Sequence, residues 1–239
     1  VLLRIRSRRP HPTLDDKIIT AWNGLMISAF AKGHQILEDP RYLKASRAAA
    51  NFIMDHLCDS SGSRLLRRYR DGDSRFAGGL QDYAFLIQGM VDLYESSFEE
   101  RWIATAASLA QTMIGEFWDE AHGGFYDATG KDASLLVRTK EDYDGAEPTG
   151  NSVAAIVLLR LAQLMNKAEW RQMAERTIGA FGDRLHQTPD ALAQLLVAVG
   201  WLLSAPVEIV IVGGRDAADT AVLLRIVRQR LMPNKVIML

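Results

Sequence analysis

A pair of helical patterns, one apolar and one amphipathic, recurs along this sequence. The apolar patterns begin near Leu14, Leu80 and Pro148, so the spacing is about 66–68 residues. Each apolar pattern predicts a helix buried on most sides, and each amphipathic pattern predicts an outer partner for it. Repeated helical hairpins bury their faces against their neighbours, which is typical of an α-solenoid or an (α/α) toroid. The repeat therefore predicts a mainly α fold.

Three helical hairpins and one further helix are expected from the periodicity. The first helix is expected to run to about Leu37, with Asp15 or Asp16 as its cap. The other predicted helices span 42–57, 80–94, 99–118, 148–164, 168–185 and 189–204. A short β-hairpin is expected at 123–130, where the sequence reads GGFYDATG.

The character of the sequence changes near residue 206. Residues 207–212 are β-branched and apolar, Gly213-Gly214 forms a turn, 217–231 has a helical pattern, and 235–239 is a second strand candidate. This order predicts a βαβ unit. We therefore expect an (α/α) toroid fragment at 1–205 and a small α/β piece at 206–239. The turn lacks both phosphate-binding glycine motifs, so packing of a small sheet on the helical body is favoured over nucleotide binding.

The composition is that of an ordinary globular chain. Of 239 residues, 48% are hydrophobic and 24% charged, and the formal net charge is −1, so no global field favours nucleic acid or anionic lipid as a partner. The longest apolar run, 191–205, is shorter than the ~20 residues of a membrane span. Cys58 is the single cysteine and no metal-ligand spacing occurs, which predicts a cytoplasmic protein with no cofactor or metal. Because the chain opens without methionine, we expect it to be part of a longer protein.

The stretch 142–151, DYDGAEPTGN, is the most chemically loaded part of the sequence. Acids crowd into a turn at Gly145, and Pro148 then opens an apolar helix. Proline suits a first helical turn, and carboxylates suit the positive end of the helix dipole. Asn151 follows just inside this helix, where packing alone gives no reason for a polar side chain. The stretch predicts a functional site without specifying its reaction.

Polar groups mark the beginnings of all three apolar helices, and in a toroid these beginnings converge on one mouth. Enzymes that act on sugars use carboxylates for proton transfer, aromatic rings for stacking and amides for hydrogen bonds to hydroxyl groups. The alternative is that Asp15, Asp82 and Glu147 are simple helix caps. The residues predicted as catalytic are Asp16, Asp82 and Asp144, and those predicted to bind substrate are Trp22, Asn23, Tyr83, Glu147 and Asn151.

Three longer motifs resemble one known family. PTLDDKIITAWNGLM (12–26), LQDYA (80–84) and DGAEPTGNS (144–152) resemble the thioredoxin-domain-containing proteins that include spermatogenesis-associated protein. The resemblance covers nearly the whole chain. It implies a thioredoxin-like domain upstream, followed by an (α/α) toroid similar to N-acylglucosamine 2-epimerases and six-hairpin glycosidases. Members of this family often carry an acid at the position of Gln81, directly before Asp82. The glutamine in this chain argues against a tandem acid pair as the catalytic unit.

Two functions follow from these features. The first is a carbohydrate-binding or carbohydrate-processing domain. Epimerases of this fold use inner-helix histidines, which this chain lacks at the helix starts, so carboxylate-based hydrolysis or lyase chemistry fits better than epimerisation. The second is a non-catalytic scaffold that presents the thioredoxin-like domain to other proteins. Because an incomplete ring leaves apolar faces uncovered, pairing with a second copy of the chain is also expected.

Overall fold

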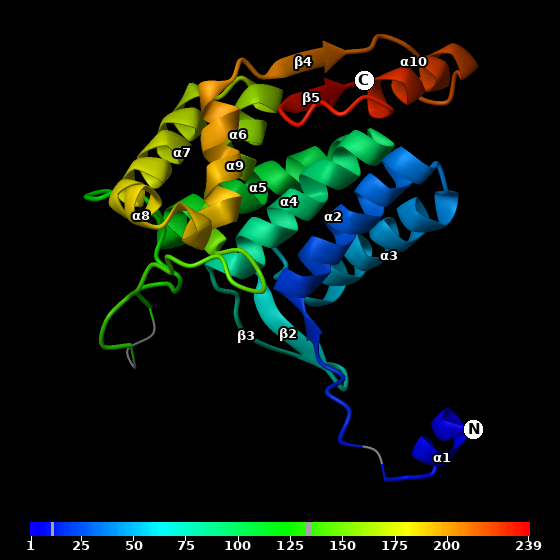
Figure 1. Ribbon diagram of the computed structural model, residues 1–239, viewed down its shortest axis with the longest axis vertical. Helices are drawn as coiled ribbons and strands as arrows, with labels where there is room; N and C mark the ends of the chain where they lie inside the picture. Colours follow the sequence, from blue (N-terminus) through cyan, green and yellow to red (C-terminus); the bar gives the residue numbers. More distant parts are fainter. Residues whose placement is uncertain (11, 132–134) are drawn as a thin grey trace.

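The computed structural model describes residues 1–10, 12–131 and 135–239, and these residues fold mainly as helical hairpins (Figure 1). The hairpins are α2 (Thr20–Leu37) with α3 (Pro40–His56), α4 (Leu80–Ser97) with α5 (Glu100–Phe117), and α6 (Gly150–Met165) with α7 (Ala168–Ala180). The helices α2, α4, α6 and α9 (Ala193–Leu203) contact one another in that order. This arrangement confirms the predicted (α/α) toroid of hairpins, present here as an arc.

Helix α4 forms the centre of the core. Its side chains are buried along almost its full length because α2, α5 and α6 pack around it. Two glycines allow α2 and α4 to approach closely. A Cβ atom at Gly24 would lie 2.5 Å from the carbonyl carbon of Phe85, and one at Gly89 would lie 2.7 Å from the carbonyl oxygen of Gly24. The shared backbone surface fixes how the first two hairpins stack.

Two helix starts follow local capping rules. Asp39 accepts a hydrogen bond from the N–H of Arg41 at 2.9 Å, and Pro40 occupies the first position of α3. Thr149 caps α6 and accepts from the N–H of Ser152 at 3.1 Å. Pro148 therefore precedes the helix rather than opening it.

The first predicted helix begins later than expected because a strand precedes it. Strand β1 (Ile18–Ile19) pairs antiparallel with β2 (Leu66–Arg70), which in turn pairs with β3 (Asp73–Ala77). The expectation that Asp15 or Asp16 caps this helix is thus wrong: both lie outside α2, whose first residue is Thr20. The β2–β3 hairpin lies below the helix starts in Figure 1.

The connection between α5 and α6 does not form the expected hairpin. Among its described residues, an isolated bridge between Trp118 and Phe125 is the β pairing present. Residues 132–134 of this connection lie outside the described ranges.

Two predicted helices are interrupted in the structure. The predicted helix 168–185 divides at Phe181 into α7 and α8 (Gly182–Gln187), and the next begins as a 3₁₀ turn, η1 (Pro189–Leu192), before α9.

The last elements form the predicted βαβ unit. Strands β4 (Val207–Val210) and β5 (Lys235–Met238) pair in parallel and are joined by α10 (Ala218–Arg228). The unit lies across the ends of α2, α4 and α6 (Figure 1), and β5 contacts α4 and α6. Division of the chain between residues 205 and 206 stays a prediction. At the other end of the chain is the short helix α1 (Leu2–Arg6).

Within the described ranges, every helix is too short or too polar to cross a lipid bilayer.

Candidate functional site

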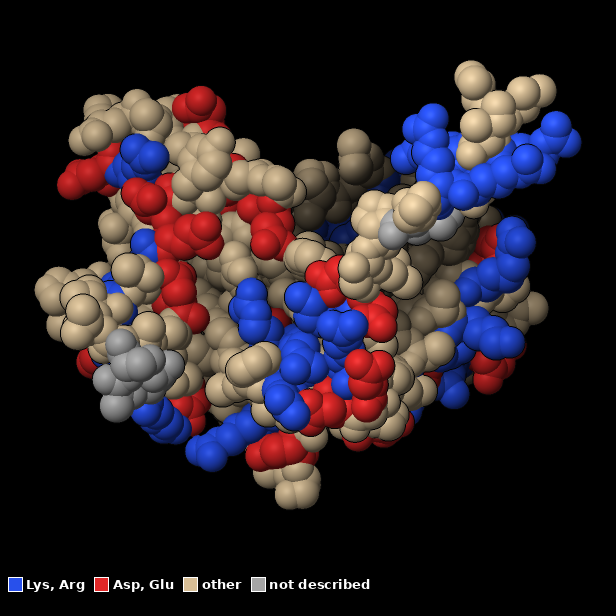
Figure 2. Space-filling model, turned by 90° about the horizontal axis from the view of Figure 1, so that it is seen from below, with Lys and Arg blue, Asp and Glu red and all other residues tan. Residues whose placement is uncertain are grey.

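The beginnings of the inner helices are joined by hydrogen bonds across long stretches of sequence. The N–H of Ala21 in α2 donates to Asp82 Oδ1 in α4 at 3.0 Å. Trp22 Nε1 donates to Glu147 Oε2, in the segment before α6, at 3.0 Å. The helix starts and the segment before α6 therefore meet at one end of the arc. Figure 2 shows the face at this end, where basic and acidic side chains lie close together.

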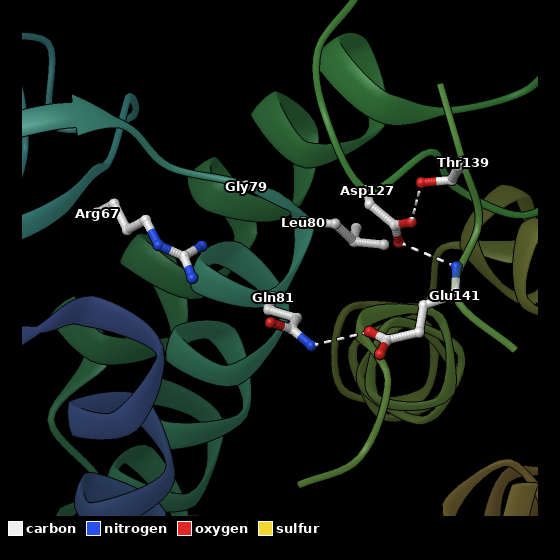
Figure 3. Close-up of a pocket in the computed structure, with 7 residues that line it drawn as sticks. All are labelled: Arg67, Gly79, Leu80, Gln81, Asp127, Thr139 and Glu141. Atoms are coloured by element: carbon white, nitrogen blue, oxygen red, sulfur yellow. Dashed lines mark hydrogen bonds between the residues drawn. The ribbon is translucent and has the colours of Figure 1, made fainter. Parts of the chain in front are cut away.

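A cavity of about 390 Å³ opens at the start of α4 (Figure 3). Its lining comes from β2, from the start of α4 and from the connection before α6: Arg67, Gly79, Leu80, Gln81, Asp127, Thr139 and Glu141. Gln81 Nε2 donates to Glu141 Oε2 at 3.2 Å across the cavity. The N–H of Leu80 donates to the carbonyl oxygen of Asp127 at 3.1 Å, which ties the connection to α4.

Asp82 lies directly behind this lining and is fully buried. Its second carboxylate oxygen accepts from the N–H of Gly79 at 2.9 Å, and Arg67 Nη1 lies 3.7 Å away. Burial raises the pKa of Asp82 to about 6, although the two backbone hydrogen bonds and Arg67 oppose the rise and Glu147 adds to it. The protonated and ionised forms of this carboxyl group therefore coexist near pH 6.

Two further carboxyl groups of the cavity also hold protons more tightly than usual. Burial raises the pKa of Glu141, and the negative charges of Asp127 and Glu147 add to the rise. Burial also raises the pKa of Asp127, which accepts hydrogen bonds from Thr139 Oγ1 at 2.9 Å and from the N–H of Glu141 at 3.2 Å. Several raised carboxyl pKa values in one cleft are a mark of functional sites.

An aromatic ring and an amide lie beside these acids on α2. The side chain of Trp22 is 59% exposed although its indole N–H is held by Glu147, so a face of the ring is open to a ligand. Asn23 donates through Nδ2 to the carbonyl oxygen of Ile19 at 2.9 Å, which leaves its side-chain oxygen without a hydrogen bond among the described residues.

The other two acids predicted as catalytic have partners away from the cavity. Asp16 forms an ion pair with Arg70 of β2 at 2.7 Å. Asp144 accepts from the N–H groups of Thr149 at 2.7 Å and Gln194 at 2.8 Å, so it joins the starts of α6 and α9. These contacts are those of a surface ion pair and a double helix cap.

Tyr83 and Asn151 each hold the connecting segment that precedes their own helix against the core. The Tyr83 hydroxyl accepts from the N–H of Leu65 at 3.0 Å. Asn151 Oδ1 accepts from the N–H of Phe125 at 2.7 Å, and Asn151 Nδ2 donates to the carbonyl oxygen of Phe125 at 2.8 Å. Both side chains are buried. The polar residue at position 151 thus has a packing reason after all, because it satisfies the backbone of the segment that precedes α6.

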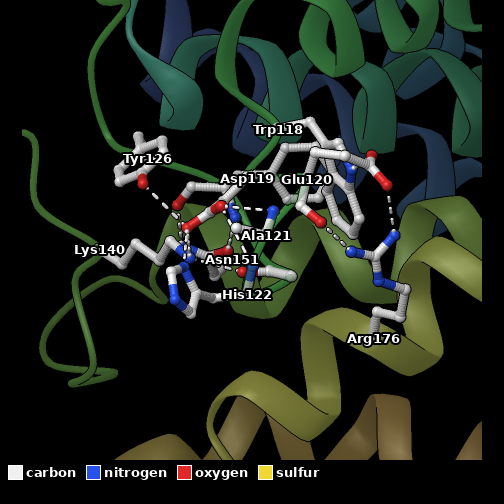
Figure 4. Close-up of polar contacts among 11 residues, drawn as sticks. Trp118, Asp119, Glu120, Ala121, His122, Tyr126, Lys140, Asn151 and Arg176 are labelled. Carbon is white, nitrogen blue, oxygen red and sulfur yellow. Dashed lines mark hydrogen bonds and ion pairs between the residues drawn. The ribbon is translucent and has the colours of Figure 1, made fainter.

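Asp119 anchors the connection that carries Glu141 (Figure 4). Its carboxylate accepts from Lys140 Nζ at 2.8 Å, from the Tyr126 hydroxyl at 2.9 Å and from the N–H of Ala121 at 2.9 Å. Hydrogen bonding from Lys140 holds the pKa of Asp119 well below its usual range. Because Lys140 immediately precedes Glu141, this cluster positions one wall of the cavity.

Sequence reasoning missed a buried charged group at the opposite end of the inner helices. Arg160 of α6 pairs with Asp92 and Glu95 of α4, each at 2.8 Å, and all three side chains are buried. Lys32 of α2 lies 3.1 Å from Asp92. Acids three residues apart in an otherwise apolar helix were the available signal. The described residues contain no cluster of three or more His, Cys, Asp or Glu side chains arranged to hold a metal ion.

No family model matches this sequence. The chain is 36% identical over 247 residues to human spermatogenesis-associated protein 20 and 36% identical to its mouse counterpart. Each alignment covers all of this chain but only 31% of the relative, so the chain spans about a third of the relatives' length.

Solved structures of similar fold are carbohydrate-processing enzymes of the (α/α) toroid type. Cellobiose 2-epimerase from Spirochaeta thermophila has a TM-score of 0.58 at 18% identity and covers 69% of this chain and 43% of its own. The GH76 α-mannanase from Bacteroides thetaiotaomicron has a TM-score of 0.58 at 14% identity and covers 72% and 47%. A family 105 glycoside hydrolase from C. acetobutylicum has a TM-score of 0.56 at 12% identity and covers 80% and 59%. The chain is thus homologous over its whole length to about a third of spermatogenesis-associated protein 20, and its fold is an (α/α) toroid similar to those of sugar epimerases and six-hairpin glycosidases.

Proposed function

We propose that the cavity at the start of α4 binds a carbohydrate. The observation that supports this most strongly is that the Gln81 amide and the Glu141 carboxyl line the cavity, while the exposed Trp22 lies at the neighbouring start of α2 and is held by Glu147. Amides and carboxylates bind sugar hydroxyl groups, and an indole face suits the apolar face of a sugar ring. The fold neighbours act on carbohydrates, which is consistent with this assignment.

Glu141 is the carboxyl group that we assign to the ligand, because it lines the cavity and its pKa is raised. Of the three acids predicted as catalytic, we keep only Asp82 in the proposed site. Its buried carboxyl group contacts Gly79 and Arg67, and its ionisation determines the charge next to the cavity. Asp16 and Asp144 are assigned to structure because their oxygens are engaged elsewhere. A thioredoxin-like domain as partner and pairing with a second copy stay predictions.

Carboxyl groups with raised pKa values suit proton transfer at a glycosidic bond. Histidine is missing from the described residues that line the cavity. We therefore assign the site to carboxylate-based hydrolysis or lyase chemistry, and not to the epimerisation carried out by some fold neighbours. Candidate substrates are those of the fold neighbours: cellobiose, a mannoside, or an unsaturated glucuronyl sugar. The last is suggested by the unsaturated glucuronyl hydrolase of Bacillus sp. GL1, which has a TM-score of 0.54 at 16% identity.

Calorimetric titration with cellobiose, mannobiose and an unsaturated glucuronyl disaccharide tests this function. We expect at least one of them to bind, and Glu141→Gln and Gln81→Ala each to weaken binding about tenfold, the effect of losing one good polar contact. Glu169→Gln, an exposed acid on α7, is the matched control and should bind as the original protein does. All variants should melt within a few degrees of one another.

If none of the sugars binds, or if Glu141→Gln binds as well as the control, the carbohydrate assignment fails. The non-catalytic scaffold is then the better account of the same fold, since fold alone does not determine activity.

A further inference from the structure

A second cavity, of about 660 Å³, lies away from the opening described above. It is an open cavity lined by residues of α2, α4, α6 and α9 and of the segment 228–235, which leads from α10 to β5. Gln88 and Glu95 of α4 and Arg160 of α6 reach it, and they come from the later turns of their helices. The cavity is therefore distinct from the site at the start of α4.

The charges on the inner helices balance one another. Arg160 lies 2.8 Å from both Asp92 and Glu95, and Lys32 lies 3.1 Å from Asp92. Two buried acids are thus paired with two bases, the buried Arg160 and the half-exposed Lys32. The helices alone contribute no excess charge to the cavity.

The segment 228–235 adds three cations: Arg228, Arg230 and Lys235. Arg228 Nη2 donates to the carbonyl oxygens of Glu95 and Ser96, at 2.8 and 3.1 Å. Lys235 Nζ donates to the carbonyl oxygens of Val227 and Arg230, at 2.8 and 3.3 Å. Carbonyl oxygens satisfy these hydrogen bonds but leave the positive charges unneutralised.

The cavity is therefore electropositive. Among the described residues that line it, Glu95 is the one acid, and it already pairs with Arg160. Burial lowers the pKa of Lys235, and the neighbouring charges of Lys32 and Arg228 act in the same direction, although Glu95 opposes them. Burial also lowers the pKa of Arg228. An anion in the cavity would offset the cost of holding these cations together.

Part of the cavity wall is apolar. Ile36 of α2 and Val197 of α9 are exposed there, and Ile156 of α6 and Trp201 of α9 also line it with little exposed surface. A cavity with an apolar wall and a few convergent charged groups has the character of a small-molecule site. A simple inorganic ion would leave that wall in contact with water.

We propose that this cavity binds a small organic anion, in which an apolar or aromatic body lies against Val197 beside Trp201 and a carboxylate or phosphate head group contacts Arg230 and Lys235. This inference does not depend on the carbohydrate assignment. It rests on three cations without an ion pair among the described residues, in a cavity whose wall is partly apolar.

Binding of three naphthalene derivatives tests the proposal: 2-naphthoate, 2-naphthyl phosphate and the neutral 2-naphthalenemethanol. Calorimetry gives the affinities, and ¹⁹F NMR of protein labelled with 5-fluorotryptophan, with Trp201→Phe for assignment, gives the location. We expect at least one anion to bind about tenfold more tightly than the alcohol, which is the effect of one charge-assisted contact, and to shift the Trp201 resonance. Whether the carboxylate or the phosphate binds more tightly identifies the head group.

Arg230→Gln and Lys235→Gln separate charge from shape. Each should weaken anion binding about tenfold and leave the affinity for the alcohol unchanged, whereas Arg75→Gln on the distant β2–β3 hairpin should change neither. Arg230 is exposed, so its variant keeps the fold even if the Lys235 variant does not. The proposal is overturned if the alcohol binds as tightly as both anions, if the Trp201 resonance stays fixed, or if Arg230→Gln binds the anions unchanged.

Discussion

Asp82 accepts a hydrogen bond from the backbone N–H of Ala21 at 3.0 Å, although 61 residues separate them in the sequence. The same carboxylate accepts from the N–H of Gly79 at 2.9 Å. One buried side chain thus joins the beginnings of two inner helices next to the residues that line the cavity. Its raised pKa makes this junction sensitive to pH.

Replacing Asp82 with Asn should remove part of the pH dependence of stability. The folded-state pKa of Asp82, about 6, lies above its ordinary value of 3.8, so the folded state binds protons more tightly than the unfolded state. The resulting stabilisation of the fold is fully present at pH values below 3.8. That stabilisation is lost as pH rises through about 6. Between pH 5 and pH 7 the loss should be about 1 kcal/mol in the free energy of unfolding.

Denaturant unfolding of the original protein and of Asp82→Asn at both pH values gives this difference. All other titrating groups are common to the two proteins, so the comparison isolates Asp82. An equal change with pH in both proteins would mean that the carboxyl group has an ordinary pKa.

Gly24→Ala should disrupt the packing of α2 on α4. The new Cβ atom would lie 2.5 Å from a backbone carbon of Phe85, so the helices must separate, and we expect a loss of about 3 kcal/mol or more in the free energy of unfolding. Gly115→Ala in α5 is the matched control. Its Cβ atom would have open space, and the change should stabilise the protein by about 0.5–1 kcal/mol. Thermal or chemical unfolding measures both, and similar effects of the two changes would contradict the close approach.

Asn151→Ala should destabilise the protein more than Tyr83→Phe does. The first change leaves both the N–H and the carbonyl oxygen of Phe125 buried without their partner, at a cost of about 2–4 kcal/mol. The second leaves only the N–H of Leu65 unpaired and should cost about 1–2 kcal/mol. Thr105→Ala, on the exposed side of α5, is a control that should change stability by less than about 0.5 kcal/mol. The reverse order of the two effects would show that the amide does not hold the connection.

Arg160→Met should strongly destabilise the fold, by about 3–5 kcal/mol, because it leaves two buried carboxylates with reduced compensation. Burial alone raises the pKa of Asp92, but Arg160 and Lys32 outweigh it and hold that pKa below its ordinary value. Without Arg160 the effect of burial dominates, so the variant should become more stable as pH falls from 7 to 5. Urea unfolding at the two pH values measures this trend. Arg171→Met, which removes an exposed ion pair with Glu175, should cost less than about 1 kcal/mol at either pH.

Local patterns in the sequence predicted the helices well and their starts less well. The apolar period identified three hairpins because each inner helix is buried on most sides. It could not separate β1 from the first turn of α2, since the pairing of Ile18 with Tyr69 is formed across the chain. The β2–β3 hairpin did have a local signal: Asp71-Gly72, both with positive φ, is a typical two-residue hairpin turn. Arginines on β2 obscured the alternation around it.

The sequence predicted where the candidate site lies, at the helix starts, but not which residues line it. Convergence of the helix starts followed from the repeat, and the contacts of Asp82 with Ala21 and of Trp22 with Glu147 agree with it. The partners of Asn151 depend on how a connection of irregular structure folds back, which no periodicity encodes. Glu141 comes directly before the acidic stretch 142–151 and was not predicted as a site residue, because only the fold places it in the cavity.

The ¹⁹F resonance of Trp22 tests the central claim most directly. In protein labelled with 5-fluorotryptophan, with Trp22→Phe for assignment, we expect a neutral or acidic disaccharide of the panel to shift this resonance. The sugar concentration that gives half of the shift should be about tenfold higher in Glu141→Gln and unchanged in Glu169→Gln. The other four tryptophans lie in or just after α5, in α7 and in α9, and should not respond. A Trp22 resonance that stays fixed with every sugar, or that shifts at the same sugar concentrations in Glu141→Gln, would contradict a carbohydrate site at the start of α4.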